Sequence, residues 1–330
     1  MGGSALRKAE TVSELKVGVV GVGVMGSYHA QVYAGLPGVE LVGVADPDPE
    51  RREEIEQDLE VRSYSRAEEL LGKVQAVSIA SPTSLHYAQA RMFLEAGVHV
   101  LVEKPMTASL PEAYEIVQLS ERQGLVLQVG HIMRFYRAVA ELPRLVHQPW
   151  VLEARRVGNN RRIRDIGVIL DLMIHDLDLV LLLLRERPSR YSVFGRTLDG
   201  LDEYAHAVLE FPSGARAVLT ASRVSPEPER SFTITQAGEV IRLDFSNGPF
   251  TEISVHKTAN GLVPAASETS NEVRVERSSL HNDNPLRRQL KHFVDRIVKG
   301  DPAAVTLEDD ILTLELALEL TRSLKPAMVH

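Results

Sequence analysis

The chain has 330 residues, a length that predicts about two domains and a core of ordinary size. It carries 45 acidic and 37 basic side chains, and this net charge of −8 argues against a nucleic-acid-binding protein, which needs a basic face. The absence of cysteine excludes disulfide scaffolds, thiolate nucleophiles and cysteine-ligated metals. Residues 166–184 form the most apolar stretch, but their ionisable groups do not suit a membrane span, and the first 15 residues lack a secretory signal. We therefore expect a cytoplasmic enzyme or binding protein without a membrane or nucleic-acid partner.

The first part of the chain alternates strand-like and helix-like segments. We expect residues 1–15 to form a flexible tail and residues 16–130 to form one domain. Strands are predicted over residues 16–20, 39–45, 76–80, 98–102 and 126–129. Helices are predicted up to residue 34 and over residues 50–56, 67–71, 85–96 and 110–123. Strands that are almost continuously apolar and alternate with helices predict a doubly wound parallel sheet of the α/β class, the Rossmann arrangement.

A glycine-rich loop follows the first expected strand directly, with the sequence Gly21-Val22-Gly23-Val24-Met25-Gly26. The pattern G-x-G-x-x-G is weak alone, but here a strand precedes it and a helix follows it, as in dinucleotide-binding folds. Gly21 allows the tight turn, Gly23 lets the backbone approach a pyrophosphate, and Gly26 lets the helix pack on the strand. The positive N-terminal end of the helix then faces the phosphates. The alternative is a glycine turn in an α/β fold that binds no cofactor.

Asp46 lies at the end of the second expected strand, 20 residues after the last glycine of the loop. Its carboxylate can accept hydrogen bonds from the adenosine ribose and would repel a 2′-phosphate. We therefore predict NAD as the cofactor, with NADP less favoured, although Arg51 and Arg52 nearby leave NADP open.

Two polar segments follow the third and fourth strands, Ser81-Pro82-Thr83 with His86 beyond it and Glu103-Lys104-Pro105. Ligands of open α/β sheets gather at the carboxyl ends of the strands, so both segments are expected to face the nicotinamide. Lys104 there can polarise a carbonyl or hydroxyl group; the alternative is a solvated lysine paired with Glu103. The predicted cofactor contacts are Gly21, Gly23, Val24, Met25, Gly26, Asp46, Ser81, Pro82, Thr83, His86, Glu103 and Lys104.

The pattern changes after residue 130. A long helix is predicted over residues 166–184, and alternating strands follow at 191–196, 204–211, 215–222, 232–236, 240–245 and 253–257. A loop is expected at 264–271, and helices at 285–299 and 308–324 close the chain, the last one packing back on the first domain. Residues 131–330 are therefore predicted to form an α+β domain with a large, mostly antiparallel open sheet for substrate binding. Because one face of that sheet lacks a cover, we expect a homodimer or homotetramer through it.

The long helix carries Asp171, His175 and Asp178 at positions i, i+4 and i+7, which places them on one helix face. Asp171 can orient the His175 imidazole and stabilise its protonated form, which predicts an acid–base pair. Asp178 is a candidate structural partner. Two alternatives are a buried structural histidine and a metal site of two carboxylates and one imidazole; the prediction is that no metal is bound.

Together these motifs resemble the Gfo/Idh/MocA family of NAD(P)-dependent oxidoreductases, from about residue 16 to residue 324. The sequence AGVHVLVEKP at residues 96–105 is close to the family pattern A-G-x-H-V-x-x-E-K-P. Ser81, Pro82 and His86 match its S/T-P-x-x-x-H pattern, and Arg134 with the following phenylalanine matches its R-F. The resemblance implies that Lys104, Asp171 and His175 are the catalytic residues. Met173 departs from the family, which often has glycine there.

Within that family, residues 161–176 resemble the branch that oxidises nucleotide-linked amino sugars, with the UDP-N-acetylglucosamine 3-dehydrogenases as the example. Five arginines lie just before the helix, namely Arg155, Arg156, Arg161, Arg162 and Arg164. Guanidinium groups can hold a diphosphate bidentately, although a solvated or subunit-facing loop is the alternative. The predicted substrate-binding residues are Lys104, Arg134, Arg161, Arg162, Arg164, Asp171 and His175.

The resulting hypothesis is the reversible oxidation of a secondary alcohol of a sugar, nucleotide sugar or cyclitol. His175, oriented by Asp171, would take the hydroxyl proton while Lys104 hydrogen-bonds the same oxygen, and these two roles are interchangeable on the sequence alone. Three alternatives stay open: a non-catalytic NAD-binding sensor, a dehydrogenase of a free sugar or inositol, and a metal-dependent lyase or isomerase.

Overall fold

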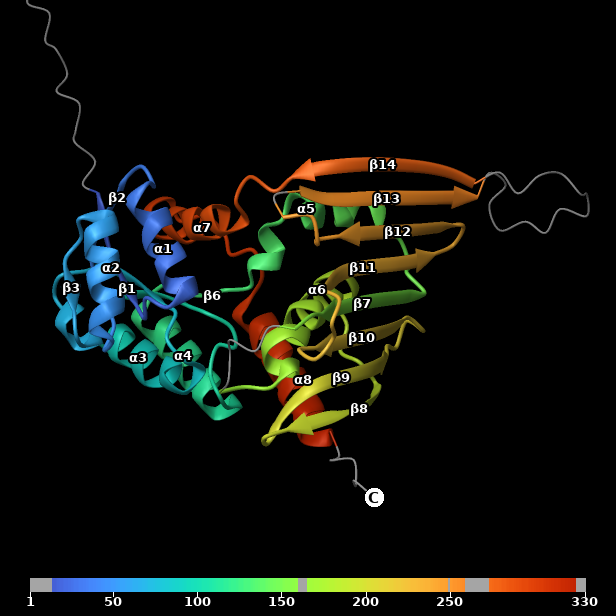
Figure 1. Ribbon diagram of the computed structural model, residues 1–330, viewed down its shortest axis with the longest axis horizontal. Helices are drawn as coiled ribbons and strands as arrows, with labels where there is room; N and C mark the ends of the chain where they lie inside the picture. Colours follow the sequence, from blue (N-terminus) through green and yellow to red (C-terminus); the bar gives the residue numbers. More distant parts are fainter. Residues whose placement is uncertain (1–13, 160–164, 249, 259–272, 325–330) are drawn as a thin grey trace, which may run out of the picture.

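A computed structural model of the chain describes residues 14–159, 165–248, 250–258 and 273–324. It contains two sheets, one with six strands and one with eight. Figure 1 shows the six-stranded sheet and its helices on the left of the molecule and the eight-stranded sheet on the right. None of the helices in the described ranges is long and apolar enough to cross a membrane.

The six-stranded sheet is parallel throughout. From one edge to the other its strands are β3 (Ser63–Tyr64), β2 (Val39–Ala45), β1 (Leu15–Val20), β4 (Ala76–Ile79), β5 (His99–Val102) and β6 (Leu127–Val129). The order reverses between β1 and β4, and ligands of such folds bind at the carboxyl ends of the strands beside this point. The predicted doubly wound sheet is confirmed.

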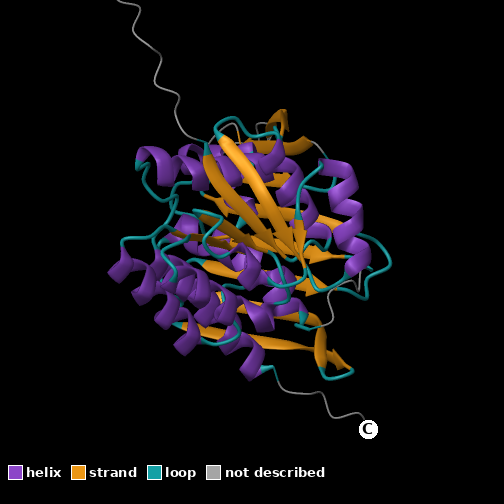
Figure 2. Ribbon diagram, turned by 90° about the vertical axis from the view of Figure 1, so that its left-hand side faces the viewer, coloured by secondary structure: helices purple, strands orange, loops and turns teal. Residues whose placement is uncertain are grey.

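Helices cover both faces of this sheet, as Figure 2 shows from the side. The helices of this part are α1 (Val24–Ala34), α2 (Pro49–Leu59), η1 (Ala67–Leu70), α3 (Thr83–Glu95) and α4 (Leu110–Gln123). A later helix, α7 (Pro285–Lys299), joins them, because its Leu290 and Phe293 belong to the same buried core as Val17 and Val19 of β1. The chain therefore returns to the first sheet after completing the second.

The eight-stranded sheet is antiparallel except for one parallel pair, β7 with β10, so the predicted mostly antiparallel sheet is confirmed. In spatial order its strands are β14 (Val273–His281), β13 (Phe250–Thr258), β12 (Glu239–Asp244), β11 (Glu229–Gln236), β7 (Val151–Val157), β10 (Arg216–Ser222), β9 (Leu201–Glu210) and β8 (Arg190–Leu198). β7 and β14 were not expected from the sequence. The expected loop at 264–271 lies outside the described residues.

Helices cover one face of this sheet and bury its apolar side chains. They are η2 (Ile132–Phe135), α5 (Arg137–Leu145), η3 (Ile169–Met173), α6 (Ile174–Leu184) and α8 (Leu307–Ser323). α8 contacts α6 and η3 and also α4 of the first part. α8 therefore lies between the two sheets (Figure 1).

The single helix expected over residues 166–184 begins later and in a different form. Its first turn, η3, is a π-helix, and only from Ile174 does the backbone become α-helical. Asp202 at the start of β9 binds this turn, since its Oδ2 accepts a hydrogen bond from Ile169 N at 2.8 Å. A Cβ on Gly167 would lie 1.7 Å from Asp202 Oδ1, so only glycine lets the carboxylate reach this turn. A π-turn contains more residues than an α-turn, so the expected common face of Asp171 and the α6 residues is not kept.

Candidate active site

The glycine loop joins β1 to α1 with the geometry that a dinucleotide needs. Gly21 has φ +80°, and a Cβ there would lie 2.7 Å from the backbone N of Ser81. A Cβ on Gly26 would lie 1.7 Å from the carbonyl oxygen of Gly21. At Gly23, by contrast, the nearest atom to an added Cβ is 3.8 Å away on the Arg51 side chain, which leaves room for a ligand to approach the backbone. Gly21 and Gly26 therefore stand where a larger residue does not fit, and the approach of a pyrophosphate to Gly23 stays a prediction.

Asp46, immediately after β2, is held beside this loop. Its Oδ2 accepts a hydrogen bond from Val22 N at 2.8 Å, and its Oδ1 accepts one from Asp48 N at 2.9 Å. Arg52 donates to the Asp46 carbonyl oxygen, and the exposed Arg51 comes within 3.9 Å of the carboxylate. The carboxylate is therefore fixed where the adenosine ribose of a dinucleotide lies in this fold, which favours NAD over NADP.

The segment after β4 is tied to the segment after β5 by His86. Its Nδ1 lies 2.9 Å from the Pro105 carbonyl oxygen, and its Nε2 lies 2.9 Å from the Ser81 carbonyl oxygen. The imidazole is 1% exposed, and burial lowers its pKa. Both ring nitrogens of His86 thus contact backbone carbonyl oxygens and join the two loops. This geometry does not support the predicted contact between His86 and the cofactor. Thr83 N, at the start of α3, donates to Asp165 Oδ2 at 3.2 Å across the two parts of the molecule.

Lys104 follows β5 and points at the π-turn of the second part. Its Nζ donates to Asp171 Oδ1 at 2.8 Å and to the Asp171 carbonyl oxygen at 2.7 Å. The lysine side chain is only 12% exposed, and Glu103 turns instead toward the buried His29 of α1, 3.2 Å away. The alternative of a solvated Lys104 paired with Glu103 is therefore wrong, because Lys104 pairs with Asp171.

His175 lies just beyond the point where the π-helix becomes α-helical. Its Nδ1 is buried and has no hydrogen-bond partner, and no ion pair joins it to Asp171 within the described structure. Burial lowers the pKa of His175 well below its ordinary value, and the positive charges of Lys104 and Arg156 lower it further. The expected orientation of His175 by Asp171 is thus not observed, because that carboxylate binds Lys104. The lowered pKa favours the neutral form of the imidazole, which lies near enough to Lys104 for that charge to act on it.

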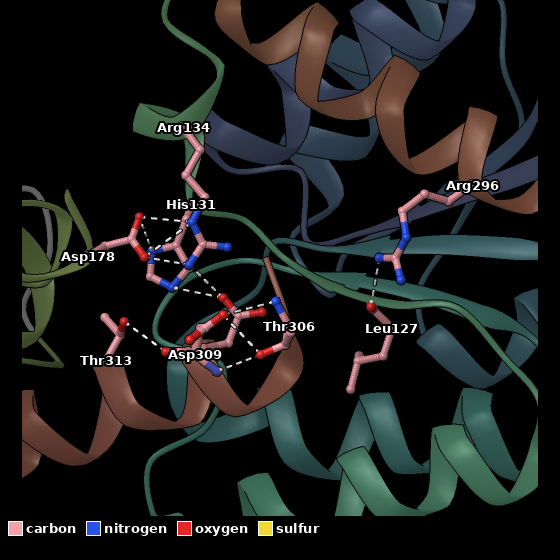
Figure 3. A network of polar contacts seen from close by, with 9 residues as sticks. Leu127, His131, Arg134, Asp178, Arg296, Thr306, Asp309 and Thr313 are labelled. Carbon is pink, nitrogen blue, oxygen red and sulfur yellow. Dashed lines mark hydrogen bonds and ion pairs between the residues drawn. The ribbon is translucent and has the colours of Figure 1, made fainter. Parts of the chain in front are cut away.

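Arg134, predicted to bind substrate, lies instead in a buried ionic cluster (Figure 3). Its Nε lies 2.9 Å from Asp178 Oδ2, and one of its terminal nitrogens lies 2.7 Å from Asp310 Oδ1. His131 lies within 3.9 Å of the same two carboxylates. With both carboxylates bound to it, the guanidinium has a structural role here, and Asp178 is its partner as the sequence suggested.

The same cluster is the one group of potential metal ligands in the described part of the chain, formed by His131, Asp178 and Asp310. The guanidinium of Arg134 already lies between the two carboxylates and supplies the positive charge that a cation would bring. Burial and the Asp178 charge raise the pKa of Asp310 to about 7, and Arg134 opposes that rise. Burial lowers the pKa of His131 to about 4.

Several charged residues near the site have positions or partners that the sequence does not predict. Arg156 of β7 was expected in an arginine cluster but is buried and pairs with Asp176 at 2.8 Å. Arg223 and Glu203 come together at the ends of β10 and β9, close to Asp171. Arg230 of β11 is paired directly with Arg156 of the neighbouring strand β7. No local motif marks these positions, because their partners are distant in the chain. Arg161, Arg162 and Arg164 lie outside the described residues.

Comparison with known protein families identifies the fold. Residues 15–131 match a family described as an oxidoreductase family with an NAD-binding Rossmann fold, and residues 143–242 match the GFO/IDH/MocA C-terminal domain. The chain belongs to the Gfo/Idh/MocA family of oxidoreductases. The family resemblance, the prediction of an enzyme and the NAD cofactor are thereby confirmed.

Individual members of the Gfo/Idh/MocA family match along most of the chain. UDP-N-acetylglucosamine 3-dehydrogenase of Acidithiobacillus ferrooxidans is 36% identical over 291 residues, which cover 87% of this chain and 90% of that protein. A solved structure of the enzyme of that name from the same organism has a TM-score of 0.84 at 33% identity and covers 94% of this chain and 98% of the other. The scyllo-inositol 2-dehydrogenase (NAD(+)) of Bacillus subtilis is 27% identical, with 96% and 95% covered.

The residues of this Gfo/Idh/MocA member fit NAD. The open backbone at Gly23 and the fixed carboxylate of Asp46 suit the pyrophosphate and the ribose. Val24 is 50% exposed and Met25 36%, so these two apolar side chains at the start of α1 are available to a ligand. When bound, the nicotinamide accepts or gives a hydride.

Proposed function

We propose that this oxidoreductase reversibly oxidises a secondary alcohol of a UDP-linked amino sugar, of the UDP-N-acetylglucosamine 3-dehydrogenase type. The observation that carries the proposal is the pairing of Lys104 Nζ with Asp171 at 2.8 Å beside the neutral His175, at the carboxyl end of β5. An ammonium donor and a neutral base are the two groups that alcohol oxidation requires from the protein.

The roles follow from the protonation and the contacts of these side chains. His175 is neutral and has an unpartnered Nδ1, so it is suited to receive the hydroxyl proton of the substrate. Lys104 is suited to donate a hydrogen bond to the same oxygen and to stabilise negative charge as it develops there. Asp171 holds the lysine through its carboxylate and its carbonyl oxygen, so Asp171 positions Lys104 rather than His175.

The nucleotide-linked substrate is supported by the Acidithiobacillus relative and by Arg230. Directly opposite residues of an antiparallel pair project to the same face, so Arg230 shares the helix-covered face with Arg156. Arg230 is exposed, and in the described structure its guanidinium makes no hydrogen bond or ion pair. Its charge acts on both His175 and Asp176. An unpaired guanidinium at this place suits a diphosphate, as do the predicted contacts of Arg161, Arg162 and Arg164.

A second copy of the chain is proposed to cover the open face of the eight-stranded sheet, giving a homodimer or homotetramer. Phe194 of β8 is 61% exposed on that face and stacks on His206 of β9 with 4.9 Å between ring centroids. An exposed aromatic residue on an uncovered sheet face is typical of a protein interface.

The test is formation of NADH, followed at the nicotinamide absorbance band, with UDP-N-acetylglucosamine, free N-acetylglucosamine and two inositols. Turnover is expected with the nucleotide sugar at a kcat/KM at least about tenfold above that with the others. Faster turnover of an inositol would favour the alternative that the Bacillus relative represents. NAD binding without turnover of any compound would favour a sensor.

A further inference from the structure

We propose that Arg223 is a positioning residue: a buried guanidinium that fixes the Asp171 carboxylate and, through it, the ammonium of Lys104. The inference rests on the proposed function, in which Lys104 contacts the reacting oxygen. It assigns a role to a residue that follows β10, far in the chain from every motif of the family.

Arg223 is unusually buried for an arginine, with 2% of its surface exposed. A buried guanidinium destabilises a protein unless carboxylates and carbonyl oxygens surround it. Here one terminal nitrogen donates to the carbonyl oxygen of Ile166, and the backbone N donates to the Glu203 carbonyl oxygen at 3.0 Å. With the side chain enclosed in this way, Arg223 is not placed to touch the substrate.

The guanidinium lies between two carboxylates. Its Nε is 3.9 Å from Asp171 Oδ2 and 4.0 Å from Glu203 Oε2. The other oxygen of Asp171, Oδ1, accepts the hydrogen bond from Lys104. The charges therefore alternate along a row, from Glu203 through Arg223 and Asp171 to Lys104. Because a cation faces each oxygen of Asp171, the plane of its carboxylate is fixed and Oδ1 is directed at the lysine.

Arg223 also holds the backbone that carries Asp171. Ile166, whose carbonyl oxygen it binds, lies just before the π-turn, and Asp202 next to Glu203 accepts from Ile169 N within that turn. The ends of β9 and β10 thus fix both the start of the turn and the carboxylate inside it. Without Arg223, Asp171 would be free to take another rotamer, and Lys104 would keep the carbonyl oxygen of Asp171 but lose its carboxylate acceptor.

The first experiment measures the accessibility of Lys104 without any substrate. Wild-type protein and the Arg223→Met, Arg223→Lys and Asp171→Asn variants are acylated briefly with an amine-reactive ester, and labelling is quantified by mass spectrometry. Labelling of Lys104 relative to Lys257, a half-exposed lysine on β13, is expected to rise about tenfold in Arg223→Met and Asp171→Asn and less in Arg223→Lys. Unchanged labelling in a folded Arg223→Met protein would overturn the inference.

The second experiment is a double-mutant cycle with Lys104→Met, measured with the substrate that the activity screen identifies. If Arg223 acts through Lys104, Arg223→Met lowers kcat about 10²-fold in the wild type and has little further effect in the Lys104→Met background, while the Kd for NAD changes less than about threefold in both. Equal losses in the two backgrounds would show a merely structural role and contradict the inference.

One further variant, Glu203→Gln, and the labelling result distinguish a failure of this inference from a failure of the proposed function. If Arg223→Met does not fold, Glu203→Gln removes the outer charge of the row at nearly constant volume, and it is expected to raise Lys104 labelling and lower kcat about threefold or more. No effect of Glu203→Gln or Arg223→Lys on either quantity would refute the inference. If the screen finds no turnover, the proposed function fails, while the labelling result still decides whether Arg223 holds Asp171 and Lys104 together.

Discussion

Lys104 and Asp171 are separated by 67 residues, yet the ammonium of one lies 2.8 Å from the carboxylate of the other. The first follows a parallel strand of one sheet and the second lies in a π-turn over the other. Their contact joins the part of the chain that matches the NAD-binding family to the part that matches its C-terminal domain. The proposed chemistry therefore requires both halves of the molecule to be docked.

Replacement of Lys104 by Met is expected to lower kcat about 10²- to 10³-fold, because the developing charge on the substrate oxygen loses its donor. The Kd for NAD, measured by protein fluorescence, is expected to change less than about threefold, since the pyrophosphate and ribose contacts lie elsewhere. Lys299→Met on the exposed end of α7 is the control. A kcat within about threefold of wild type would remove Lys104 from the catalytic residues.

The pH dependence of kcat/KM is expected to follow His175. Burial and the charges of Lys104 and Arg156 place its pKa well below the ordinary value, so the neutral base persists in mild acid. Activity is expected to stay constant from about pH 8 down to about pH 6 and to fall only at lower pH. His175→Ala is expected to lower kcat by about 10²-fold or more and to remove this acidic limb. An acidic limb centred near the ordinary histidine pKa would contradict the assignment.

Cofactor preference is expected to depend on Asp46. Replacing it with Ser removes the charge that repels a 2′-phosphate, while a small hydroxyl can still accept from the Val22 amide. The ratio of kcat/KM for NADP to that for NAD is expected to rise about tenfold or more, and initial rates with both cofactors measure it. An unchanged ratio would show that another residue, such as Arg51, sets the preference.

The stability of an Asp310→Asn variant is expected to depend on pH differently from that of the wild type. The pKa of Asp310 is raised to about 7 in the folded protein, whereas an unfolded aspartate titrates near 4. Between these values only the folded state holds the proton, so the contribution of this group is present in acid and is lost as the pH rises. The free energy of unfolding of the variant minus that of the wild type should rise by at least about 1 kcal/mol between about pH 5 and about pH 8.

Urea titrations at both pH values measure this difference. His131 titrates in the opposite sense but is present in both proteins, so its effect largely cancels. A difference that is constant or falls with pH would show that Asp310 is ionised throughout and bound to Arg134 alone.

Arg230→Ala is expected to raise the KM for the nucleotide sugar about tenfold with little effect on kcat, because a remote phosphate contact is the same in ground and transition states. The affinity of the wild type for the nucleotide sugar should also fall as salt rises. Arg242 of β12 is exposed on the opposite face of the same sheet, and Arg242→Ala provides the matched control. Equal effects of the two variants would indicate general electrostatics rather than a phosphate contact at Arg230.

The helices and strands with continuous apolar sequences could be predicted, because a local run of apolar residues indicates a buried element. β14 was missed since its sequence, VRVERSSLH, is largely polar and reads as a loop. β7 was missed because its inward-facing Arg156 breaks the apolar alternation, and only the distant Asp176 neutralises it. The π-turn could not be predicted for the same reason. The carboxylate that binds its backbone belongs to Asp202, 33 residues further along the chain. Residue types and motifs predict Lys104, Asp171 and His175 as catalytic candidates, but they do not predict which two of them pair.

The placement of α8 has a consequence for protein synthesis. This helix supplies Asp310 to Arg134 and packs against η3 and α6, which carry Asp171 and His175. While the ribosome still holds these residues, the helix that carries the proposed catalytic residues lacks its cover, and Arg134 lacks one of its two carboxylates. α7 and α8 also complete the buried core of the first sheet, so a nascent chain gains both its full dinucleotide fold and the proposed activity only when the last helix has emerged.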